Sequence, residues 1–196
     1  MDRVWEAAAD SSYREGMRAF LILLPALLLL SSCAGNSEPP PPEPIERVDL
    51  PRYMGKWYEI ARLPNDFQEQ CVGSTTAEYT LRTDGRIDVM NRCRTAEGEI
   101  DVVRGIARPA GDDGSNARLE VSFFDILGWR PAWDDYWIIG LERGYDWAVV
   151  GQPEREYGWI LSRSPRLTDT TRERIDRLLR EQGYDPEQFI DSSGNH

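Results

Sequence analysis

Short stretches of alternating apolar and polar residues run through most of the chain, a pattern typical of strands that bury one face. Turn residues separate them at short intervals, which favours a barrel or a sandwich. The pair Asp84-Gly85 between two stretches is a strong hairpin signal. Eight strands are predicted: Trp57–Arg62, Thr75–Leu81, Ile87–Cys93, Ile100–Ala107, Leu119–Phe124, Tyr136–Leu141, Trp147–Val150 and Trp159–Ser162.

A helical pattern follows the last strand. Thr168 or Thr170 can cap its first turn, Ile175 and Leu179 share an apolar face, and Gly183 ends it. A helix with one apolar face can pack outside a barrel. The predicted fold is therefore all-β, an eight-stranded antiparallel up-and-down barrel with one C-terminal α-helix packed outside.

Near the N-terminus, an apolar run from Phe20 to Leu30 has the length of a signal peptide core and is too short to span a bilayer. Residues 1–16 are acidic, whereas Met17-Arg18 supplies the basic start that a secretion signal needs. We expect residues 1–32 to be a signal peptide and translation to begin at Met17.

The run ends in Leu30-Ser31-Ser32-Cys33, which resembles the lipobox of bacterial lipoproteins. That resemblance implies a lipid attached to Cys33, and Ala34 after it favours the outer membrane, with the protein facing the periplasm. The alternative is an ordinary secretion signal with a cysteine nearby by chance. The Pro-rich residues 33–46 predict an extended tether, with a stand-off of roughly 40 Å, and residues 47–196 form the barrel domain.

The chain carries 34 acidic and 23 basic residues, a formal net charge of −11. Removal of residues 1–32 takes away four acidic and three basic groups, which leaves −10. An acidic chain without a basic run has no affinity for phosphate backbones, so nucleic acid is excluded as a partner.

Two stretches about a hundred residues apart predict how the barrel closes. Gly55 permits a sharp turn two residues before Trp57, and Arg163 follows the last strand. A guanidinium lying on the indole face would join the first and last strands through a cation–π contact worth roughly 0.5–2 kcal/mol.

These two stretches, together with Tyr145-Asp146-Trp147, resemble the motifs of the lipocalins, in particular the bacterial outer-membrane lipoprotein lipocalins that are similar to apolipoprotein D. The middle motif departs from the family's Thr-Asp-Tyr by having Gly144-Tyr145-Asp146. The resemblance covers roughly residues 48–190. It implies a barrel that is closed at one end and holds one small ligand.

Alternation along the strands predicts which side chains face the barrel interior. With Trp57 at the closed end, Glu59 points inward with it, and small residues elsewhere leave room for a cavity. The alternative is that these side chains only fill a core. The predicted ligand-binding residues are Ala61, Ala77, Tyr79, Val89, Ala107, Val121, Phe123, Trp159 and Leu161.

Loops of an up-and-down barrel alternate between its ends. The predicted mouth loops are 63–74, 94–98, 125–135 and 152–156, and the tether is expected at the closed end. The mouth loop that contains Trp129 and Trp133 is unusually apolar. It either helps lipid uptake, by touching a membrane or covering the cavity, or folds back onto the barrel.

Cys71 and Cys93 are expected to form a disulfide, which the periplasm supports. An ideal hairpin register from Asp84-Gly85 pairs Cys93 with Thr76, so the bridge needs a bulge or an irregular strand start. The alternative is two free thiols.

The resemblance implies a membrane-anchored protein that stores or transports fatty acids or lysophospholipids, with the polar head near the mouth. An enzyme is disfavoured, because the single histidine is the terminal His196 and no triad or typical zinc site can be assembled. No catalytic residue, metal or cofactor is predicted. The alternatives are a structural envelope lipoprotein with a filled barrel, or a lipid-modifying enzyme.

Overall fold

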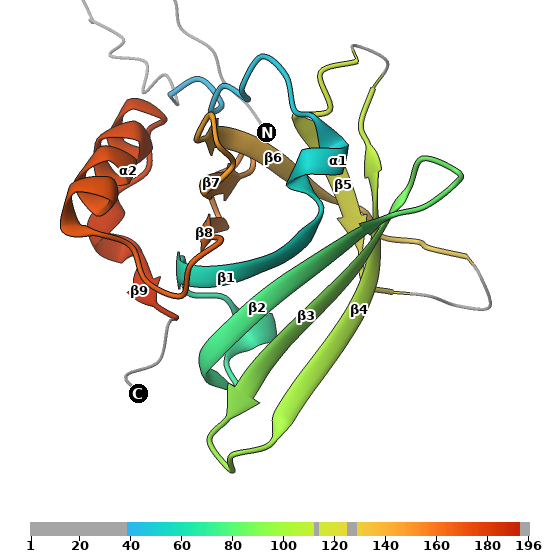
Figure 1. Cartoon of the computed structure of the whole chain (residues 1–196), viewed down its shortest axis with the longest axis horizontal. Helices are drawn as coiled ribbons and strands as arrows, with labels where there is room; N and C mark the ends of the chain where they lie inside the picture. Colours follow the sequence, from blue (N-terminus) through green and yellow to red (C-terminus); the bar gives the residue numbers. More distant parts are fainter. Residues whose placement is uncertain (1–38, 112–113, 125–128, 193–196) are drawn as a thin grey trace, which may run out of the picture. The chain divides into compact units, whose positions relative to one another are not determined.

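A computed structural model describes residues 39–111, 114–124 and 129–192. Within these residues, all of which belong to one compact unit, the dominant element is a closed antiparallel sheet (Figure 1). None of the helices described there combines the length and the apolar character needed to cross a bilayer.

Eight strands form the barrel in sequence order, and the ring closes where the first strand pairs with the second. A short ninth strand extends the sheet beyond the first. The strands are β1 (Gly55–Arg62), β2 (Cys71–Leu81), β3 (Ile87–Thr95), β4 (Ile100–Pro109), β5 (Arg118–Ser122), β6 (Asp134–Leu141), β7 (Trp147–Gly151), β8 (Gly158–Ser162) and β9 (Ile190–Asp191).

The long helix packs outside the barrel, as predicted. The side chain of Thr168 accepts a hydrogen bond from the Thr171 amide and caps it. Ile175 and Leu179 are fully buried in a cluster with Val149 and Ile160 from the outer faces of β7 and β8. The helical elements are α1 (Leu50–Tyr53), η1 (Asp66–Gln68), α2 (Asp169–Glu181) and η2 (Pro186–Gln188).

The β2–β3 hairpin has a longer loop than the ideal two-residue turn. Leu81 pairs with Ile87, and Arg82 and Arg86 close a three-residue loop in which Gly85 adopts a φ of 81°. Only glycine adopts this conformation freely. The extra residue moves the register by one and corrects the predicted pairing: Thr76 lies opposite Arg92, not Cys93.

At the closed end, Arg163 lies flat on Trp57, with its guanidinium carbon 3.7 Å from the ring centroid. The same guanidinium donates hydrogen bonds to the backbone oxygens of Arg52, Tyr53, Met54 and Lys56. Gly55 has a φ of 90°, and a Cβ there would lie 3.6 Å from Arg163. The predicted contact therefore joins β1, β8 and α1 across the closed end.

The Pro-rich segment is docked on the barrel from Pro40 onward, so residues 40–46 are not the free tether that the sequence predicted over residues 33–46. Glu43 and Gln182 exchange two hydrogen bonds between backbone and side chain. The Ile45 amide donates to the Ile138 carbonyl, and Arg155 donates to the Pro40 carbonyl. Pro40 therefore lies against the β7–β8 loop at the mouth, near Gln182 at the end of α2, which Arg155 also contacts.

Candidate functional site

The barrel interior contains a cavity of about 400 Å³. This volume is typical of small-ligand sites, which are mostly apolar with few polar groups. The cavity runs from Tyr79, Leu161 and Tyr136 near the closed end to Phe67 and Phe124 at the mouth. The interior is therefore not filled by its own side chains.

The structure brings all but one of the predicted ligand-facing residues to the cavity wall. Small side chains leave the space: Ala77 and Ala107 are buried on β2 and β4, and a Cβ on Gly105 would clash with the Phe123 ring. The predicted residues that line the cavity are Ala77, Tyr79, Val89, Ala107, Val121, Phe123, Trp159 and Leu161.

Ala61 is the exception, and the structure corrects its predicted orientation. The pairing of β1 with β8 shifts between Glu59 and Ala61, so that Ile60 is an additional residue in β1. A bulge of this kind reverses the facing of every later residue. Ala61 consequently pairs with Ile160 and is buried under α2, outside the barrel.

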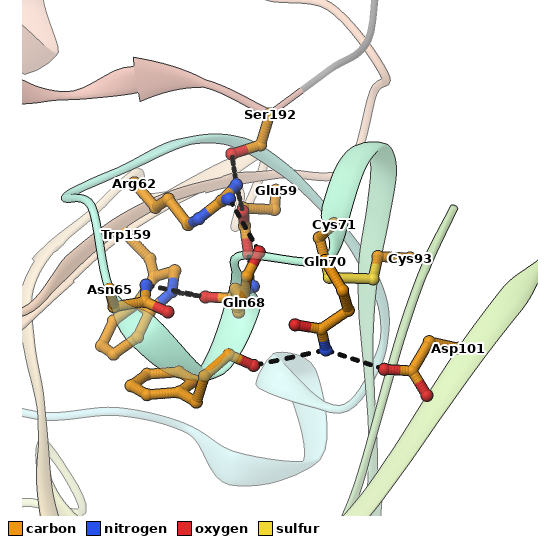
Figure 2. The surroundings of a disulfide bond; sticks show 11 residues. Glu59, Arg62, Asn65, Gln68, Gln70, Cys71, Cys93, Asp101, Trp159 and Ser192 are labelled. Atoms are coloured by element: carbon orange, nitrogen blue, oxygen red, sulfur yellow. Dashed lines mark hydrogen bonds and ion pairs between the residues drawn. A yellow bond between two sulfur atoms is a disulfide. The ribbon is translucent and has the colours of Figure 1, made fainter. Parts of the chain in front are cut away.

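A polar network holds the β1–β2 loop on β1 and β8 (Figure 2). Gln68 donates to Glu59 at 3.0 Å and accepts from the Trp159 indole at 3.1 Å and from Asn65 at 3.0 Å. Arg62 contacts Glu59 at 3.2 Å and donates to the Gln68 carbonyl. Because these groups are buried and bonded to one another, the loop is fixed at the cavity edge.

Cys71 and Cys93 form the expected disulfide, with their Cα atoms 5.5 Å apart. Irregular pairing at the start of β2, between Cys71 and Gly73 and again between Gly73 and Thr76, brings the two sulfurs together. The bridge ties the end of the β1–β2 loop to β3 next to the network around Gln68 (Figure 2). Both cysteines also line the cavity.

The two tryptophans of the β5–β6 loop have different environments. Trp129 is 65% exposed, whereas Trp133 stacks against Arg108 of β4, whose guanidinium carbon is 3.9 Å from the ring centroid. Arg130 donates to the backbone oxygens of Ser122 and Phe124. Trp133 therefore folds back onto the barrel, whereas Trp129 does not. A role of this loop in lipid uptake stays a prediction. Residues 125–128 lie outside the described part of the chain.

Three tyrosines meet at the inner end of the cavity. The Tyr136 hydroxyl lies 2.9 Å from the hydroxyls of both Tyr53 and Tyr79. Burial raises the pKa of Tyr79 to about 12 and the pKa values of Tyr53 and Tyr136 well above 10.0. These hydroxyls are thus neutral hydrogen-bonding groups under all ordinary conditions.

Glu59, a buried carboxylate of the cavity wall, has a structural role. Both oxygens of its carboxylate accept hydrogen bonds, one from Arg62 and the other from Gln68. In residues 39–111, 114–124 and 129–192, no cluster of three metal-ligating side chains is found. His196, Cys33, Met17 and the predicted signal peptide lie outside the described residues.

A closed up-and-down barrel with a hollow interior and one external helix defines the class of small-ligand-binding β-barrels. Within that class, the chain belongs to the lipocalin family: the family model described as a Lipocalin-like domain matches residues 48–193. Proteins of this family are generally binding or transport proteins for small hydrophobic molecules.

Curated relatives agree with this family assignment, and a solved structure agrees with the fold. The chain is 37% identical over 145 residues to temperature-induced lipocalin-1 of Arabidopsis thaliana, covering 73% of this chain and 77% of the relative. It is 36% identical over 147 residues to the outer membrane lipoprotein Blc of Escherichia coli K12, covering 74% and 79%. Insecticyanin from Manduca sexta superimposes with a TM-score of 0.64 at 24% identity, over 78% of this chain and 84% of that structure.

Several residues of the site were missed by sequence reasoning. Tyr53 precedes the first strand and belongs to α1, so strand alternation says nothing about it. Tyr136 begins the predicted sixth strand, whose inward face was not assigned. Gln68 lies in a loop, where no periodic pattern exists, and only its position between the first two strands could have drawn attention to it.

Proposed function

We propose that this protein is a lipid-binding lipocalin of the bacterial envelope that stores or transports single-chain lipids, either fatty acids or lysophospholipids. The observation that carries the proposal is the mainly apolar cavity of about 400 Å³ inside the barrel. Each methylene group of an acyl chain buried there contributes about 0.8 kcal/mol. A filled barrel, the structural alternative, has no such space.

Charge at the mouth favours the lysophospholipids. Asp101, Asp134 and Asp135 line the cavity at its open end, where β4 and β6 begin. A free fatty carboxylate near them is repelled, whereas the terminal ammonium group of a zwitterionic phosphocholine or phosphoethanolamine head group is attracted. The single arginine on the cavity wall in the described residues, Arg92, forms an ion pair with Glu78 at 3.3 Å.

The location is part of the proposal. Cys33 would carry the lipid anchor on the outer membrane, with the barrel facing the periplasm. Support comes from the lipobox-like Leu30-Ser31-Ser32-Cys33 and from relatives that are named outer membrane lipoproteins in Escherichia coli and Vibrio cholerae. Replacement of Cys33 by serine should move the protein from the membrane fraction to the soluble fraction; retention in the membrane would refute the anchor.

Native mass spectrometry of the Cys33→Ser protein tests the binding function. We expect co-purified single-chain lipid, and after delipidation we expect tighter binding of hexadecanoyl-lysophosphatidylcholine than of hexadecanoic acid. The preference should shrink in high salt, because screening weakens the attraction of the acidic mouth. A barrel that retains no lipid and binds neither probe would overturn the proposal.

A further inference from the structure

The inner end of the cavity carries hydrogen-bonding capacity that the protein does not use. The hydroxyls of Tyr53, Tyr136 and Tyr79 form a chain joined by two hydrogen bonds. Three hydroxyls supply three donors and up to six acceptor lone pairs. Whatever the direction of the chain, one O–H has no acceptor within it.

Tyr79 and Tyr136 both line the cavity, and Tyr79 is 7% exposed. The described residues around them are apolar, chiefly Ala77, Leu119 and Leu161. Within the described part of the chain, these hydroxyls make no further hydrogen bond. A buried donor without a partner is unfavourable. When Tyr79 or Tyr136 holds the unused O–H, it can donate that hydrogen to a group inside the cavity.

The charges near this group favour a neutral partner. Arg163 lies on the far side of Trp57 and donates its hydrogen bonds to backbone carbonyls. Glu59, a carboxylate of the cavity wall away from the three aspartates at the mouth, is paired with Arg62. Arg163 is near enough to act on the pKa values of Tyr53 and Tyr79, but only as the smallest of the causes. An ionised ligand group at the floor would thus have no side chain free to pair with it directly, and burial of an unpaired charge is strongly unfavourable.

We infer that the floor of the cavity is a hydrogen-bonding subsite for one compact, uncharged oxygen, a hydroxyl or a carbonyl, on the far end of the bound acyl chain. The inference rests on the proposed function, in which the polar head stays at the mouth. It adds that the ligands bound best are oxygenated near the end of the chain that enters first. The raised pKa values of the three tyrosines keep their hydroxyls protonated, and hence able to donate.

The test compares two probes that differ by one oxygen. Lysophosphatidylcholine carrying a hexadecanoyl chain is compared with the same lipid carrying a terminal hydroxyl on that chain, and the comparison is repeated over a series of shorter chains. The large head group cannot reach the floor, so both probes enter chain first. Dissociation constants are measured by calorimetry for the wild type, for the double variant Tyr79→Phe with Tyr136→Phe, and for Tyr157→Phe.

Tyr157 is a matched control, because it lines the cavity near Phe67 at the mouth. In the wild type and in Tyr157→Phe, the hydroxylated probe should bind at least as tightly as the plain one at the chain length that reaches the floor. In the double variant, the hydroxylated probe should become weaker by about tenfold relative to the plain one, since its oxygen is then buried without a partner.

The outcomes separate this inference from the proposed function. In one outcome, all three proteins bind the plain probe and bind the hydroxylated probe more weakly by the same factor at every chain length. This result would overturn the subsite and leave the lipid-binding function intact. No binding of either probe to the wild type would overturn both. If the double variant does not fold, Tyr79→Phe and Tyr136→Phe are compared singly, and an unchanged probe ratio in both contradicts the inference.

Discussion

The guanidinium of Arg163 lies over the indole of Trp57 and at the same time donates hydrogen bonds to the backbone oxygens of Arg52, Tyr53, Met54 and Lys56. One side chain thus bonds to the carbonyl groups at the end of α1 and the start of β1, and it also packs on the Trp57 ring at the closed end of the barrel. Its hydrogen bonds are charge-assisted and partly shielded from water, which makes them stronger than neutral ones.

Replacement of Arg163 by alanine should therefore lower the free energy of unfolding by about 3 kcal/mol, through the lost cation–π contact and the unpaired carbonyls. Urea denaturation checks this. Arg163→Lys is the control: it keeps the charge but not the planar fork, and should recover less than half of the loss. An alanine variant that changes lipid preference before it changes stability would contradict this assignment.

Loss of the disulfide should destabilise the protein. Cys71 and Cys93 close a loop with a sequence separation of 22, for which the chain-entropy model gives about 3 kcal/mol. Melting of the Cys33→Ser protein with and without reductant measures the effect, and a thiol count confirms the redox state. Equal melting temperatures would show that the bridge contributes no stability.

Gln68 should control how fast ligand leaves. In Gln68→Ala, Glu59, Asn65 and the Trp159 indole each lose a hydrogen-bond partner. Hydrogen exchange in residues 63–70 and the dissociation rate of bound lipid should both rise, by about tenfold. Gln70→Ala is a suitable control, since its side-chain amide bonds only to Asp101, which is partly exposed, and to the Phe67 carbonyl. Similar effects of both substitutions would argue against a specific role of Gln68.

Substitution of Trp129 should affect lipid uptake, whereas substitution of Trp133 should affect stability. Trp129→Ser removes an exposed ring at the mouth and should slow uptake from vesicles without changing the free energy of unfolding. Trp133→Ser removes the contact with Arg108 and should lower stability by about 0.5–1 kcal/mol. Stopped-flow transfer assays and denaturation measure the two effects. Unchanged uptake in Trp129→Ser would refute the uptake role.

Stability should fall steeply in alkali. The pKa of Tyr79 is about 12 in the folded protein, against 10.0 for an ordinary tyrosine, and burial raises the pKa values of Tyr53 and Tyr136 as well. Between these values the unfolded chain binds fewer protons, so the stability present below pH 10 is lost as the pH rises towards 12. Urea denaturation at several pH values measures the slope, which should be shallower in Tyr136→Phe. A slope equal to that of the wild type would show that Tyr136 does not contribute.

Much of the fold could be predicted because strand alternation and turn residues are local signals. The same locality explains the errors. The residues Glu59-Ile60-Ala61 give no local signal that predicts a bulge. The bulge arises from the curvature that β1 needs to pair with both β2 and β8. The three-residue loop around Gly85 and the position of Tyr53 likewise depend on partners that are distant in the chain.

Most of the predicted ligand-facing residues do lie on the cavity wall, because alternate side chains of a strand point to the same face of the sheet. The polar network could not be derived in this way. Gln68 and Arg62 act through contacts between a loop, a strand and Ser192 near the C-terminus. Such contacts depend on tertiary packing, which no pattern along the chain encodes.

The docked N-terminal segment also limits how freely an anchored barrel could turn. With Pro40 held against Arg155 of the β7–β8 loop, only residues 34–39 separate the docked chain from the proposed lipid on Cys33. Fully extended, these residues reach about 20 Å, half of the stand-off expected from an undocked tether. If Cys33 carries the proposed lipid, Pro40 on the rim could lie no farther than about 20 Å from the bilayer surface, so that lipid would have a short distance to pass between membrane and cavity.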